Sequence, residues 1–489
     1  MNFLSIDVGT TLCKCQLFSE SGEILEYLAE EYAFLKMDGK NYVNVDEMKE
    51  KLFSMIKSVG EKHEISSIAV STLGESFVLL DKDENVLFYP MLYTDPRGAK
   101  EAEYVSELLG ADAVFRITGT VPHSMYSLSK LLMIKNDYPD IYEKAEHAML
   151  MCDYVGFLLT GERVIDYSLA ARTGAFDVNA LCFSDEILSP LGIEKSLFSE
   201  PKRAGSTVAP LKKDVCERLG LRSVPTLVLG SHDQVCTTLG AGALDSGDAV
   251  DGLGTVECIT VLFDKADADV RMGMAGYPVV PFAKEGLFCT YMLNYSAGSS
   301  VNWIRKNIMH GYSGEEEDFF AYMEKNMPSE PSGLLTLPYL GGAATPYQDI
   351  DARGAVIGIS TETTDAELYR SLLEGTAMEM RLNAEFVKDH GITLKSAVAT
   401  GGGANSKSWI KIKADVQNIP IKVLRSSEGG LCGCAMLQAT ALGRARDLYE
   451  ARDIFVKYAG NTLPDAARHA SYEEQYQRYK KIYKAIKEI

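Results

Sequence analysis

Several short motifs in this sequence combine the residue types that phosphate chemistry requires. Phosphate oxygens are bound by backbone N–H groups that glycine leaves accessible, by hydroxyl groups, and by Mg²⁺ held on a carboxylate. The run Asp7-Val8-Gly9-Thr10-Thr11 supplies all three at the end of an expected strand, and Lys14 follows on the next strand. A tight hairpin turn with polar residues would give the same run, so the motif alone leaves both interpretations open. The sequence contains no Gly-x-x-x-x-Gly-Lys-Ser/Thr loop, which excludes the P-loop arrangement.

Two further glycine-rich turns lie in the second half of the chain. Gly252-Leu253-Gly254-Thr255 repeats the Gly-Thr turn, and the two turns would hold β- and γ-phosphates from opposite sides of a cleft. Gly401-Gly402-Gly403, followed by Ser406, joins an apolar strand to a helix. Three consecutive glycines cost conformational entropy, which indicates that something flat, such as adenosine, approaches the backbone. A crowded strand–helix crossing is the alternative. The Rossmann spacing fails because the sixth position is Ser406.

A carboxylate suited to proton transfer follows a third apolar strand. In Val228-Leu229-Gly230-Ser231-His232-Asp233-Gln234, small residues precede Asp233, which places it at the mouth of a cleft. Transfer of a phosphoryl group to an alcohol needs such a carboxylate to accept the hydroxyl proton. Gln234 would bind a neighbouring hydroxyl, and His232 is better explained as a packed histidine. Taken alone, Asp233 fits a helix N-cap equally well.

The elements that must position these motifs follow from the spacing of apolar residues. Residues 3–32 are predicted to form a β-meander, and residues 248–263 repeat its strand, Gly-Thr turn and strand. A long amphipathic helix is expected near 365–390, and a strand–loop–helix unit at 395–418. Further strands are predicted at 67–71, at 224–229, within 333–340, and in a hairpin around 81–85, and helices dominate 100–159. The sequence therefore predicts two α/β domains, 1–246 and 247–489, facing each other across a cleft.

Composition narrows the classes of partner. The 489 residues include 68 Asp and Glu against 49 Lys and Arg, a net charge of −19, which opposes binding to nucleic acids and anionic membranes. The strand-like opening predicts no secretory signal, and no apolar stretch approaches the ~20 residues of a membrane span. The ten cysteines include two Cys-x-Cys pairs, Cys13/Cys15 and Cys432/Cys434, but lack zinc-site spacing. We expect buried, reduced thiols and a cytoplasmic protein.

These motifs, in this order, resemble those of the FGGY family of carbohydrate kinases over essentially the whole chain. The family also contributes matches at the following places: Asp95-Pro96-Arg97, Asp153-Tyr154, residues 159–162, residues 173–177, residues 337–340, Arg353-Gly354, Glu374-Gly375, Ala414-Asp415 and residues 429–435. Each match is modest, but so many collinear matches are specific.

The resemblance implies two actin-like (ribonuclease H-like) domains that close on ATP and a small sugar. It implies that Asp233 is the general base and that Asp7 helps to hold Mg²⁺. The residues it assigns to ATP are Thr10, Thr11, Lys14, Gly254, Thr255, Gly298, Asn302, Gly401, Gly402, Gly403 and Ser406. Those it places at the sugar are Glu75, Asp95, Arg97 and Gln234. A sugar or polyol is the expected partner, without nucleic acid or membrane, and homodimerisation stays open.

Departures from the family pattern leave the substrate open. Tyr93 stands where the family usually has Trp, residues 342–346 lack the family's charges, and Leu73-Gly74-Glu75-Ser76 matches neither xylulokinase-like nor glycerol kinase-like members. The overall pattern favours a pentulose such as xylulose, with gluconate, a polyol or a signalling sugar as alternatives. From other classes, a non-catalytic sugar- or nucleotide-binding regulator would lack Asp7 or Asp233, and an ATPase-driven chaperone or scaffold would not need a sugar pocket. A dehydrogenase is disfavoured because no dinucleotide fingerprint exists.

Overall fold

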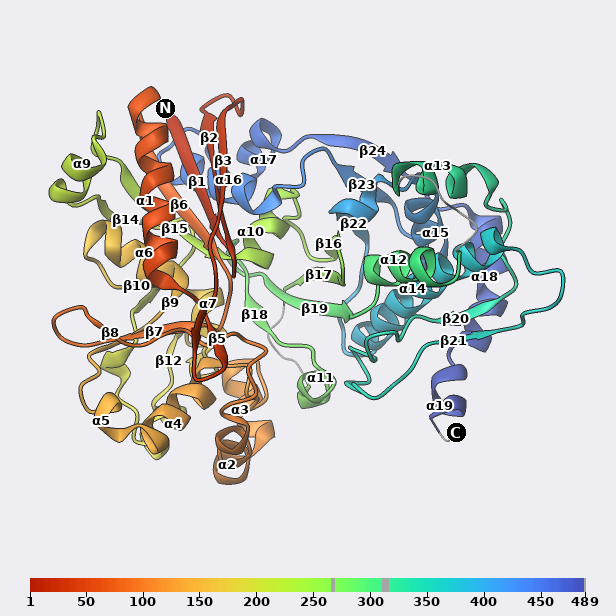
Figure 1. The fold of residues 1–489 in the computed structure, drawn as a ribbon, viewed down its shortest axis with the longest axis horizontal. Coiled ribbons are helices and arrows are strands. Elements are labelled where there is room, and N and C mark those ends of the chain that lie inside the picture. The colour runs from red at the N-terminus through yellow and green to blue at the C-terminus, as the bar shows by residue number, and fades with distance from the viewer. Residues whose placement is uncertain (265–268, 310–315, 488–489) are drawn as a thin grey trace.

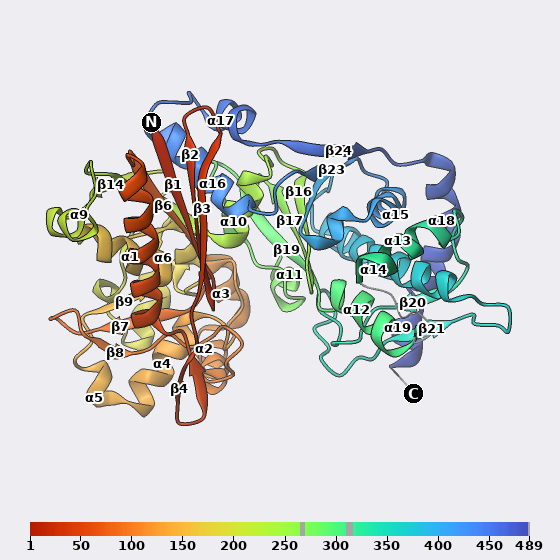
Figure 2. The same cartoon turned by 45° about the horizontal axis from the view of Figure 1, so that its top comes forward.

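A computed structural model describes residues 1–264, 269–309 and 316–487 of the chain, the side chains of 316–318 excepted. Two halves stand side by side in Figure 1, the first coloured red to yellow-green and the second green to blue. Figure 2 shows the same two halves from a second direction, with α10 (Asp233–Gly240) and α16 (Gly429–Ala441) where the halves meet. The predicted α/β architecture of two actin-like domains is confirmed.

The first half is built on a six-stranded sheet with the order β14-β15-β6-β1-β2-β3. β1 pairs antiparallel with β2 and parallel with β6, and β6 pairs parallel with β15. Phe3, Leu4 and Ile6 of β1 are fully buried, as expected for a strand covered on both faces. The strands are β1 (Asn2–Val8), β2 (Leu12–Ser19), β3 (Ile24–Glu31), β6 (Ser67–Thr72), β14 (Thr207–Pro210) and β15 (Thr226–His232).

The second half is built on a seven-stranded sheet with the order β18-β19-β17-β16-β22-β23-β24. β16 pairs antiparallel with β17 and parallel with β22, and β22 pairs parallel with β23. The strands are β16 (Asp248–Leu253), β17 (Glu257–Phe263), β18 (Val280–Pro281), β19 (Phe288–Asn294), β22 (Ser396–Thr400), β23 (Ile421–Leu424) and β24 (Tyr458–Thr462). The series β3-β2-β1-β6-β15 and β19-β17-β16-β22-β23 therefore have the same order and directions, so the predicted repeat of one plan is confirmed.

Shorter strands form small sheets and hairpins outside the two main sheets. In the first half they are β4 (Leu35–Met37), β5 (Lys40–Tyr42), β7 (Phe77–Leu80), β8 (Val86–Phe88), β9 (His147–Leu150), β10 (Val164–Asp166), β11 (Phe176–Asp177), β12 (Cys182–Phe183) and β13 (Glu200–Lys202). In the second half they are β20 (Leu335–Leu337) and β21 (Ala355–Ile357). The predicted hairpin around 81–85 is the β7–β8 pair.

Helices cover both sheets. In the first half they are α1 (Val45–Lys62), α2 (Ala99–Leu109), α3 (Ala111–Thr118), α4 (Ser127–Asp137), α5 (Pro139–Tyr142), α6 (Met151–Thr160), α7 (Tyr167–Ala171), α8 (Asp185–Leu188), α9 (Lys213–Leu219) and α10 (Asp233–Gly240), with 3₁₀ turns at Ser189–Leu191 and Lys195–Leu197. In the second half they are α11 (Val270–Met274), α12 (Gly298–Asn307), α13 (Glu316–Asn326), α14 (Asp365–Asp389), α15 (Lys407–Gln417), α16 (Gly429–Ala441), α17 (Leu448–Phe455), α18 (Ala466–Tyr479) and α19 (Ile482–Ile486), with a 3₁₀ turn at Gly402–Asn405.

The long helix predicted near 365–390 is α14, which begins at a capping box. The Thr364 hydroxyl accepts a hydrogen bond from the Glu367 backbone N–H, and the Glu367 carboxylate accepts one from Thr364 N at 2.8 Å. These bonds satisfy backbone donors that the first turn of a helix leaves unpaired. Leu372, Met380 and Val387 lie on its buried face. The helix therefore begins directly after Thr364, close to the start predicted for it.

Helices α10 and α16 pack against each other between the two halves (Figure 1). They are equivalent elements, since α10 follows β15 and α16 follows β23. The contact is backbone to backbone: a Cβ at Gly240 would lie 1.9 Å from the Gly429 carbonyl oxygen, and one at Gly433 would lie 2.0 Å from that of Cys236. Although late in the sequence, α16 also packs on β1, β6 and β15 of the first sheet. Glycine at these positions is what lets the helices approach so closely.

An ion cluster lies in the core of the second half. Lys413 of α15 is fully buried, and its Nζ lies 3.0 Å from Asp251 Oδ2 of β16 and donates to Glu257 of β17. Burial raises the pKa of Glu257, and the Lys413 charge opposes this shift. A buried ammonium of this kind needs such partners, because an unpaired charge in the core is strongly destabilising.

The cysteines are free thiols, as predicted. Eight of the ten are buried, Cys258 is half-buried and Cys182 is exposed. The closest pair of sulfurs that the structure records is Cys236 and Cys434, 3.8 Å apart across the α10–α16 contact. In the described parts of the chain, each helix is too short or too polar to cross a membrane.

Candidate active site

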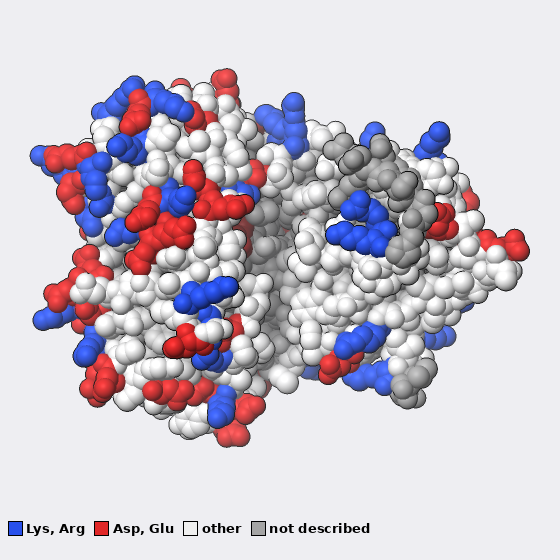
Figure 3. Space-filling view, in the orientation of Figure 1, with Lys and Arg blue, Asp and Glu red and all other residues white. Residues whose placement is uncertain are grey.

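A groove runs between the two halves on the face shown in Figure 3. The carboxyl ends of β1 and β6 and the amino ends of α10 and α16 meet at this junction of the halves. Asp7 is in register with Ser71 on the neighbouring strand β6, and Ser71 is in register with Ser231 on β15. Because Asp233 comes two residues after Ser231, the sheet brings the two predicted carboxylates to one edge, as parallel strands do with residues at their carboxyl ends.

Asp7 is a carboxylate that its surroundings keep from ionising easily. Its Oδ1 accepts a hydrogen bond from Ser71 Oγ at 2.9 Å. Burial, and after it the negative charge of Asp233, raise the pKa of Asp7 to about 7, while Ser71 and Lys14 act in the opposite direction. The two predicted carboxylates are therefore close enough to repel each other.

Asp233 is the first residue of α10, and His232 occupies the N-cap position, so the N-cap interpretation of Asp233 is wrong by one residue. His232 Nε2 lies 3.1 Å from Asp233 Oδ1. This oxygen is buried and accepts no hydrogen bond of good geometry from the described residues, although the side chain as a whole is 41% exposed. The carboxylate thus has one shielded oxygen on a partly exposed side chain. Burial raises its pKa to about 6, opposed by the Gln234 backbone N–H and the Arg172 charge.

The two carboxylates fit a magnesium site of the kind that nucleotide enzymes use. Among the described residues, no group of three or more His, Cys, Asp or Glu side chains is placed to hold a metal. Mg²⁺, however, is usually held by one or two carboxylates together with water and substrate phosphates. A cation beside Asp7 and Asp233 would also relieve the repulsion that raises the Asp7 pKa. The donor set therefore fits Mg²⁺ brought in with a nucleotide.

The first Gly-Thr turn joins β1 to β2. Gly9 N donates to Leu12 O at 2.9 Å, which closes the turn, and Thr10 and Thr11 are half-buried beside it. Lys14 of β2 forms an ion pair with Glu428, the residue before α16, with 3.0 Å between Nζ and Oε2. Lys14 therefore lies near Asp7 but is already paired in this structure.

The second Gly-Thr turn contacts two of the other predicted nucleotide elements. Gly254 O accepts a hydrogen bond from Gly298 N at 3.1 Å, and a Cβ at Gly298 would come within 2.5 Å of that oxygen. Gly401 has a φ of +86°, and a Cβ there would lie 2.7 Å from Leu253 O. The structure thus brings together the turn at 252–255, the start of α12 and the glycine triplet, as expected from the sequence.

The glycine triplet contains both crowded positions, as a tight strand–helix crossing requires, and an open one, as the approach of a ligand requires. Gly401 and Gly403 are crowded, since a Cβ at Gly403 would lie 2.9 Å from both Leu253 and Trp409. At Gly402, in contrast, a Cβ would meet no atom within 4 Å. Two of the three glycines are therefore needed for packing, and Gly402 faces open space that a ligand can reach.

Two further residues predicted to bind the nucleotide are Ser406, which caps a helix, and Asn302, which is exposed. Ser406 caps α15, accepting from Trp409 N at 3.1 Å and donating to Glu324. Asn302 is exposed on α12. Their assignment to the nucleotide stays a prediction.

The predicted sugar residues lie in the first half, and most are ion-paired. Glu75, with a left-handed φ of +57°, is buried and accepts from Arg172. Asp95 Oδ2 lies 2.6 Å from Arg97 Nη2, and Arg97 Nη1 also donates to Tyr42 Oη at 2.7 Å. Gln234 is half-buried beside Asp233.

Sequence reasoning missed two buried cations of this region. Arg172, at the end of α7, holds Glu75 and has its guanidinium carbon 5.2 Å from the Tyr126 ring centre. Lys130 Nζ donates to Ser124 O at 2.7 Å, and burial lowers its pKa to about 8. Arg172 directly precedes the motif at 173–177, but nothing local indicates its partner, which lies 97 residues away.

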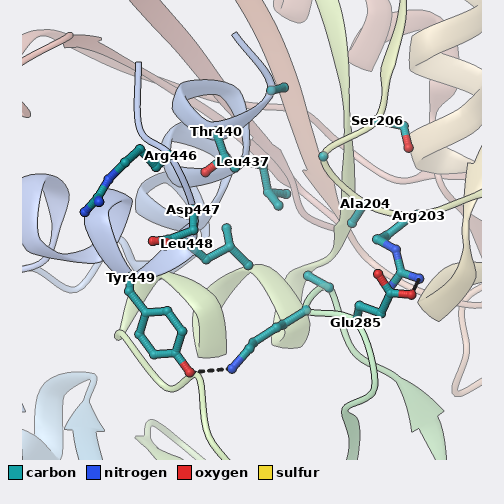
Figure 4. A pocket seen from close by; sticks show the side chains of 14 residues that line it. Arg203, Ala204, Ser206, Glu285, Leu437, Thr440, Arg446, Asp447, Leu448 and Tyr449 are labelled. Carbon is teal, nitrogen blue, oxygen red and sulfur yellow. Dashed lines mark hydrogen bonds and ion pairs between the residues drawn. The ribbon is translucent and has the colours of Figure 1, made fainter. Parts of the chain in front are cut away.

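A further pocket lies away from these residues. It has a volume of about 420 Å³ and is lined by segments of both halves and by the carboxyl end of α16, including Arg203, Lys284, Leu437 and Tyr449 (Figure 4). Asp233 and Gly429 lie at the opposite, amino ends of α10 and α16. None of the predicted site residues lines this pocket.

Comparison with known proteins places these features in a wider context. Residues 2–240 match the model of the N-terminal domain, and residues 252–442 that of the C-terminal domain, of the FGGY family of carbohydrate kinases. The chain is 26% identical to the xylulose kinase of Bacillus subtilis (strain 168), over 99% of this chain and 97% of that protein. It is 25% identical to the gluconokinase of Bacillus licheniformis, over 98% and 93%. Its fold matches the crystal structure of gluconate kinase from Lactobacillus acidophilus with a TM-score of 0.90, 24% identity, and coverage of 99% and 98%.

Proposed function

The chain belongs to the FGGY family of carbohydrate kinases, and from this premise we propose that it transfers the γ-phosphate of MgATP to a hydroxyl group of a pentulose such as xylulose. The chain is an enzyme of the phosphotransferase class that acts on sugar hydroxyls.

The observation that carries the proposal is the setting of Asp233. Its side chain is partly exposed, keeps one buried oxygen without a hydrogen bond of good geometry, and has a pKa raised to about 6. A general base works best when its pKa is near the working pH, since it is then ionised and still basic enough to take a proton. Asp233 is proposed to accept the proton of the sugar hydroxyl as that oxygen attacks the γ-phosphate.

The phosphate end of the site is proposed to use both Gly-Thr turns. Thr10 and Thr11 from the first half and Gly254 and Thr255 from the second would donate to phosphate oxygens from opposite sides. Asp7 is proposed to hold Mg²⁺, which when bound neutralises charge on the phosphates. Lys14 would exchange its Glu428 partner for a phosphate oxygen, because phosphate carries more charge than one carboxylate.

The nucleoside end is proposed to lie on the second half. Open space at Gly402 supports the approach of adenosine to the glycine triplet, with Gly401 and Gly403 providing the turn. Gly298, packed on Gly254, would let the start of α12 approach the phosphates. Asn302 and Ser406 complete this proposed set.

The charges around the proposed sugar pocket favour a neutral acceptor. Arg97 is paired with Asp95, Arg172 with Glu75, and Lys130 with backbone carbonyls. A sugar acid needs a cation that is free to pair with its carboxylate, since a buried unpaired carboxylate is costly. Glu75, Asp95, Arg97 and Gln234 are instead proposed to hydrogen-bond the hydroxyls of a neutral sugar.

Gluconate and polyols remain the alternative acceptors, because a gluconokinase is nearly as similar to this chain as a xylulose kinase is. A non-catalytic sugar- or nucleotide-binding regulator is the alternative from another class, and the presence of both Asp7 and Asp233 argues against it. Cytoplasmic location and homodimerisation stay predictions.

The test is ADP release from MgATP with a panel of ketoses, aldoses, sugar acids and polyols. A pentulose that raises turnover well above the basal ATPase rate is the expected result. Stimulation by gluconate alone would replace the pentulose with the sugar acid. ATP binding without stimulation by any compound, combined with a thermal shift by a sugar, would support the regulator instead.

A further inference from the structure

Tyr291 belongs to the second sheet, but its side chain contacts the first half. It lies on β19, is buried, and its Oη is 3.4 Å from His232 Nδ1. Its ring meets the His232 ring edge-on, with 6.1 Å between centres and 71° between planes. The guanidinium carbon of Arg172 lies 5.6 Å from the centre of the same ring. Tyr291, from the second half, therefore contacts two residues of the first half. His232 directly precedes the proposed base Asp233, and Arg172 is paired with Glu75, the proposed sugar ligand.

The contact with His232 connects Tyr291 to the residue beside the proposed base. The His232 ring is buried, and its two nitrogens face different partners. Nε2 lies 3.1 Å from Asp233 Oδ1, and Nδ1 is within hydrogen-bond distance, 3.4 Å, of the Tyr291 hydroxyl. Burial raises the pKa of Tyr291 well above its usual value, so the phenol keeps its proton.

The contact with Arg172 joins side chains of the two halves. The guanidinium carbon lies 5.2 Å from the ring centre of Tyr126, from the first half, and 5.6 Å from that of Tyr291, from the second. Arg172 in turn holds Glu75 in its left-handed conformation. The packing is tight, since a Cβ at Gly74 would lie 3.0 Å from the His232 ring. Moving Tyr291 would therefore disturb both the Glu75–Arg172 pair and the ring beside Asp233.

We propose that Tyr291 is a positioning residue that links the sugar pocket and the general base of the first half to the placement of the second half. The inference rests on the proposed function, because it takes Asp233 as the base and Glu75 as a sugar ligand. ATP is proposed to bind mainly on the second half and the sugar on the first. Tyr291 then couples the two sites. The affinity for the sugar is higher when bound ATP holds the halves in the arrangement in which the Tyr291 ring contacts His232 and Arg172.

The first test measures the coupling between the two substrates. The Kd of the sugar found in the panel is determined by calorimetry with and without a non-hydrolysable ATP analogue. The wild type is expected to bind the sugar about 5–150-fold more tightly with the analogue, the usual range for coupled sites. Tyr291→Leu, which removes ring and hydroxyl, is expected to bring this ratio close to one while leaving the Kd of the analogue alone unchanged. Wild-type coupling in Tyr291→Leu would overturn the proposal.

Tyr277→Phe is the matched control. Tyr277 is also fully buried in the second half, and its hydroxyl donates to Asn383 Oδ1 at 2.6 Å, away from the groove. This variant loses a buried hydroxyl and is expected to lower the melting temperature while keeping the coupling ratio. Equal loss of coupling in Tyr277→Phe would mean that general loosening, and not the ring at 291, is responsible.

The second test needs no sugar. ¹⁵N NMR of the histidine rings, with His232 assigned through a His232→Gln variant, is compared between wild type and Tyr291→Phe. We expect a shift of the Nδ1 resonance when the phenol hydroxyl is lost. An unchanged Nδ1 resonance would overturn the proposal. If the wild type binds no sugar of the panel, the proposed function fails, and this spectrum still decides the role of Tyr291.

Discussion

At the scale of single residues, the groove is marked by two carboxylates that burial and mutual repulsion keep from ionising readily. Asp7 and Asp233 stand at the ends of neighbouring elements, and each has a raised pKa. Structural carboxylates more often have lowered values, because salt bridges and backbone N–H groups stabilise their charge. Raised values in an open groove are typical of groups that exchange protons or bind cations.

Asp233→Asn should lower kcat by about 10²–10⁴-fold, the usual contribution of a general base. Because the base must be ionised, kcat/KM of the wild type should also fall as the pH drops below about 6, where Asp233 takes up a proton. Turnover assays across pH and calorimetry for substrate binding check both statements. Asp245→Asn, an exposed acid beyond the other end of α10, is the control. Near wild-type turnover in Asp233→Asn would remove it as the base.

Asp7→Asn should stabilise the metal-free protein at high pH while abolishing activity. The folded pKa of Asp7 is about 7 against 3.8 when unfolded, so folding opposes ionisation. The cost is absent below pH ~4, grows up to pH ~7 and is constant above it. Scanning fluorimetry in EDTA should show a melting temperature raised by a few degrees, about 2–4 °C per kcal/mol, at pH 8 and unchanged at pH 4. A pH-independent difference would contradict the assignment.

Thr255→Val should weaken ATP binding more than sugar binding. Thr255 is exposed at the tip of the second Gly-Thr turn, so the substitution leaves the core intact. Loss of a hydrogen bond to a charged phosphate is worth about 1.5–3 kcal/mol, roughly 10–150-fold in Kd. Calorimetry with each substrate checks this. A larger effect on the sugar would give this turn another role.

The individual acids of the groove could be found from the sequence, but their partners could not. Asp7 lies near the end of an apolar strand, just before a Gly-Thr turn, and Asp233 follows an apolar strand that ends in small residues; these local signals are sufficient to single out both acids. The Arg172–Glu75 pair spans 97 residues, and the Lys413–Glu257 pair spans 156. Such pairs depend on which strands become neighbours, and one sequence contains no local trace of that.

At the scale of elements, successive glycines of α16 have different neighbours: one borders Asp7 and Ser71, and another borders the backbone of α10. A Cβ at Gly430, in the first turn of α16, would lie 3.4 Å from Ser71 Oγ and 3.9 Å from Asp7 Oδ1, which are ordinary contacts. A Cβ at Gly433, one turn later, would collide with the Cys236 carbonyl oxygen. The first position borders the groove and the second borders the neighbouring helix.

Gly433→Ala should therefore destabilise the fold, by about 1–3 kcal/mol or more, as overpacking does. Gly430→Ala should leave the melting temperature nearly unchanged but lower kcat/KM by roughly 10-fold or more, because a methyl group beside Asp7 displaces the phosphates. Thermal melts and steady-state kinetics on the two variants form a matched comparison. Equal melting temperatures for the pair would contradict it.

Most elements could be predicted because periodicity is a local property. The meander predicted for 3–32 is formed by β1, β2 and β3, and the strand predicted at 67–71 is β6, which ends one residue later. β15 is the exception, since it continues past Leu229 to His232. Ser231 and His232 are polar and signal a loop, but they pair with Ser71 and Thr72 inside the sheet. β15 thus continues beyond its apolar run because Ser231 and His232 are buried and pair with β6.

At the scale of the whole molecule, two copies of one plan face each other, and the proposed substrates are divided between them. The repeat was predictable because both copies begin with a strand, a Gly-Thr turn and a strand. The return of α16 to the first sheet was not, since its apolar sequence does not distinguish one sheet from the other. Residues 429–441 consequently belong to the second half by sequence but pack on β1, β6 and β15 of the first sheet.

The halves should move closer when both substrates bind, as kinases commonly close to exclude water. Small-angle scattering on the free protein should give a radius of gyration near that of a compact chain of this length, about 23 Å. The sugar together with a non-hydrolysable ATP analogue should lower this value more than either alone. Identical scattering in all states would mean that the halves are already closed.

The uneven exposure of the thiols has a practical consequence for observing such motion. Cys182 is the one exposed cysteine of the ten, and burial raises the pKa of half-buried Cys258 to about 12, which keeps it from reacting. A maleimide dye should attach at Cys182, on β12 of the first half, without prior removal of other cysteines. A second cysteine in place of exposed Trp303, on α12 of the second half, completes a dye pair. Single-molecule energy transfer between the two dyes would then follow individual enzymes as they open and close.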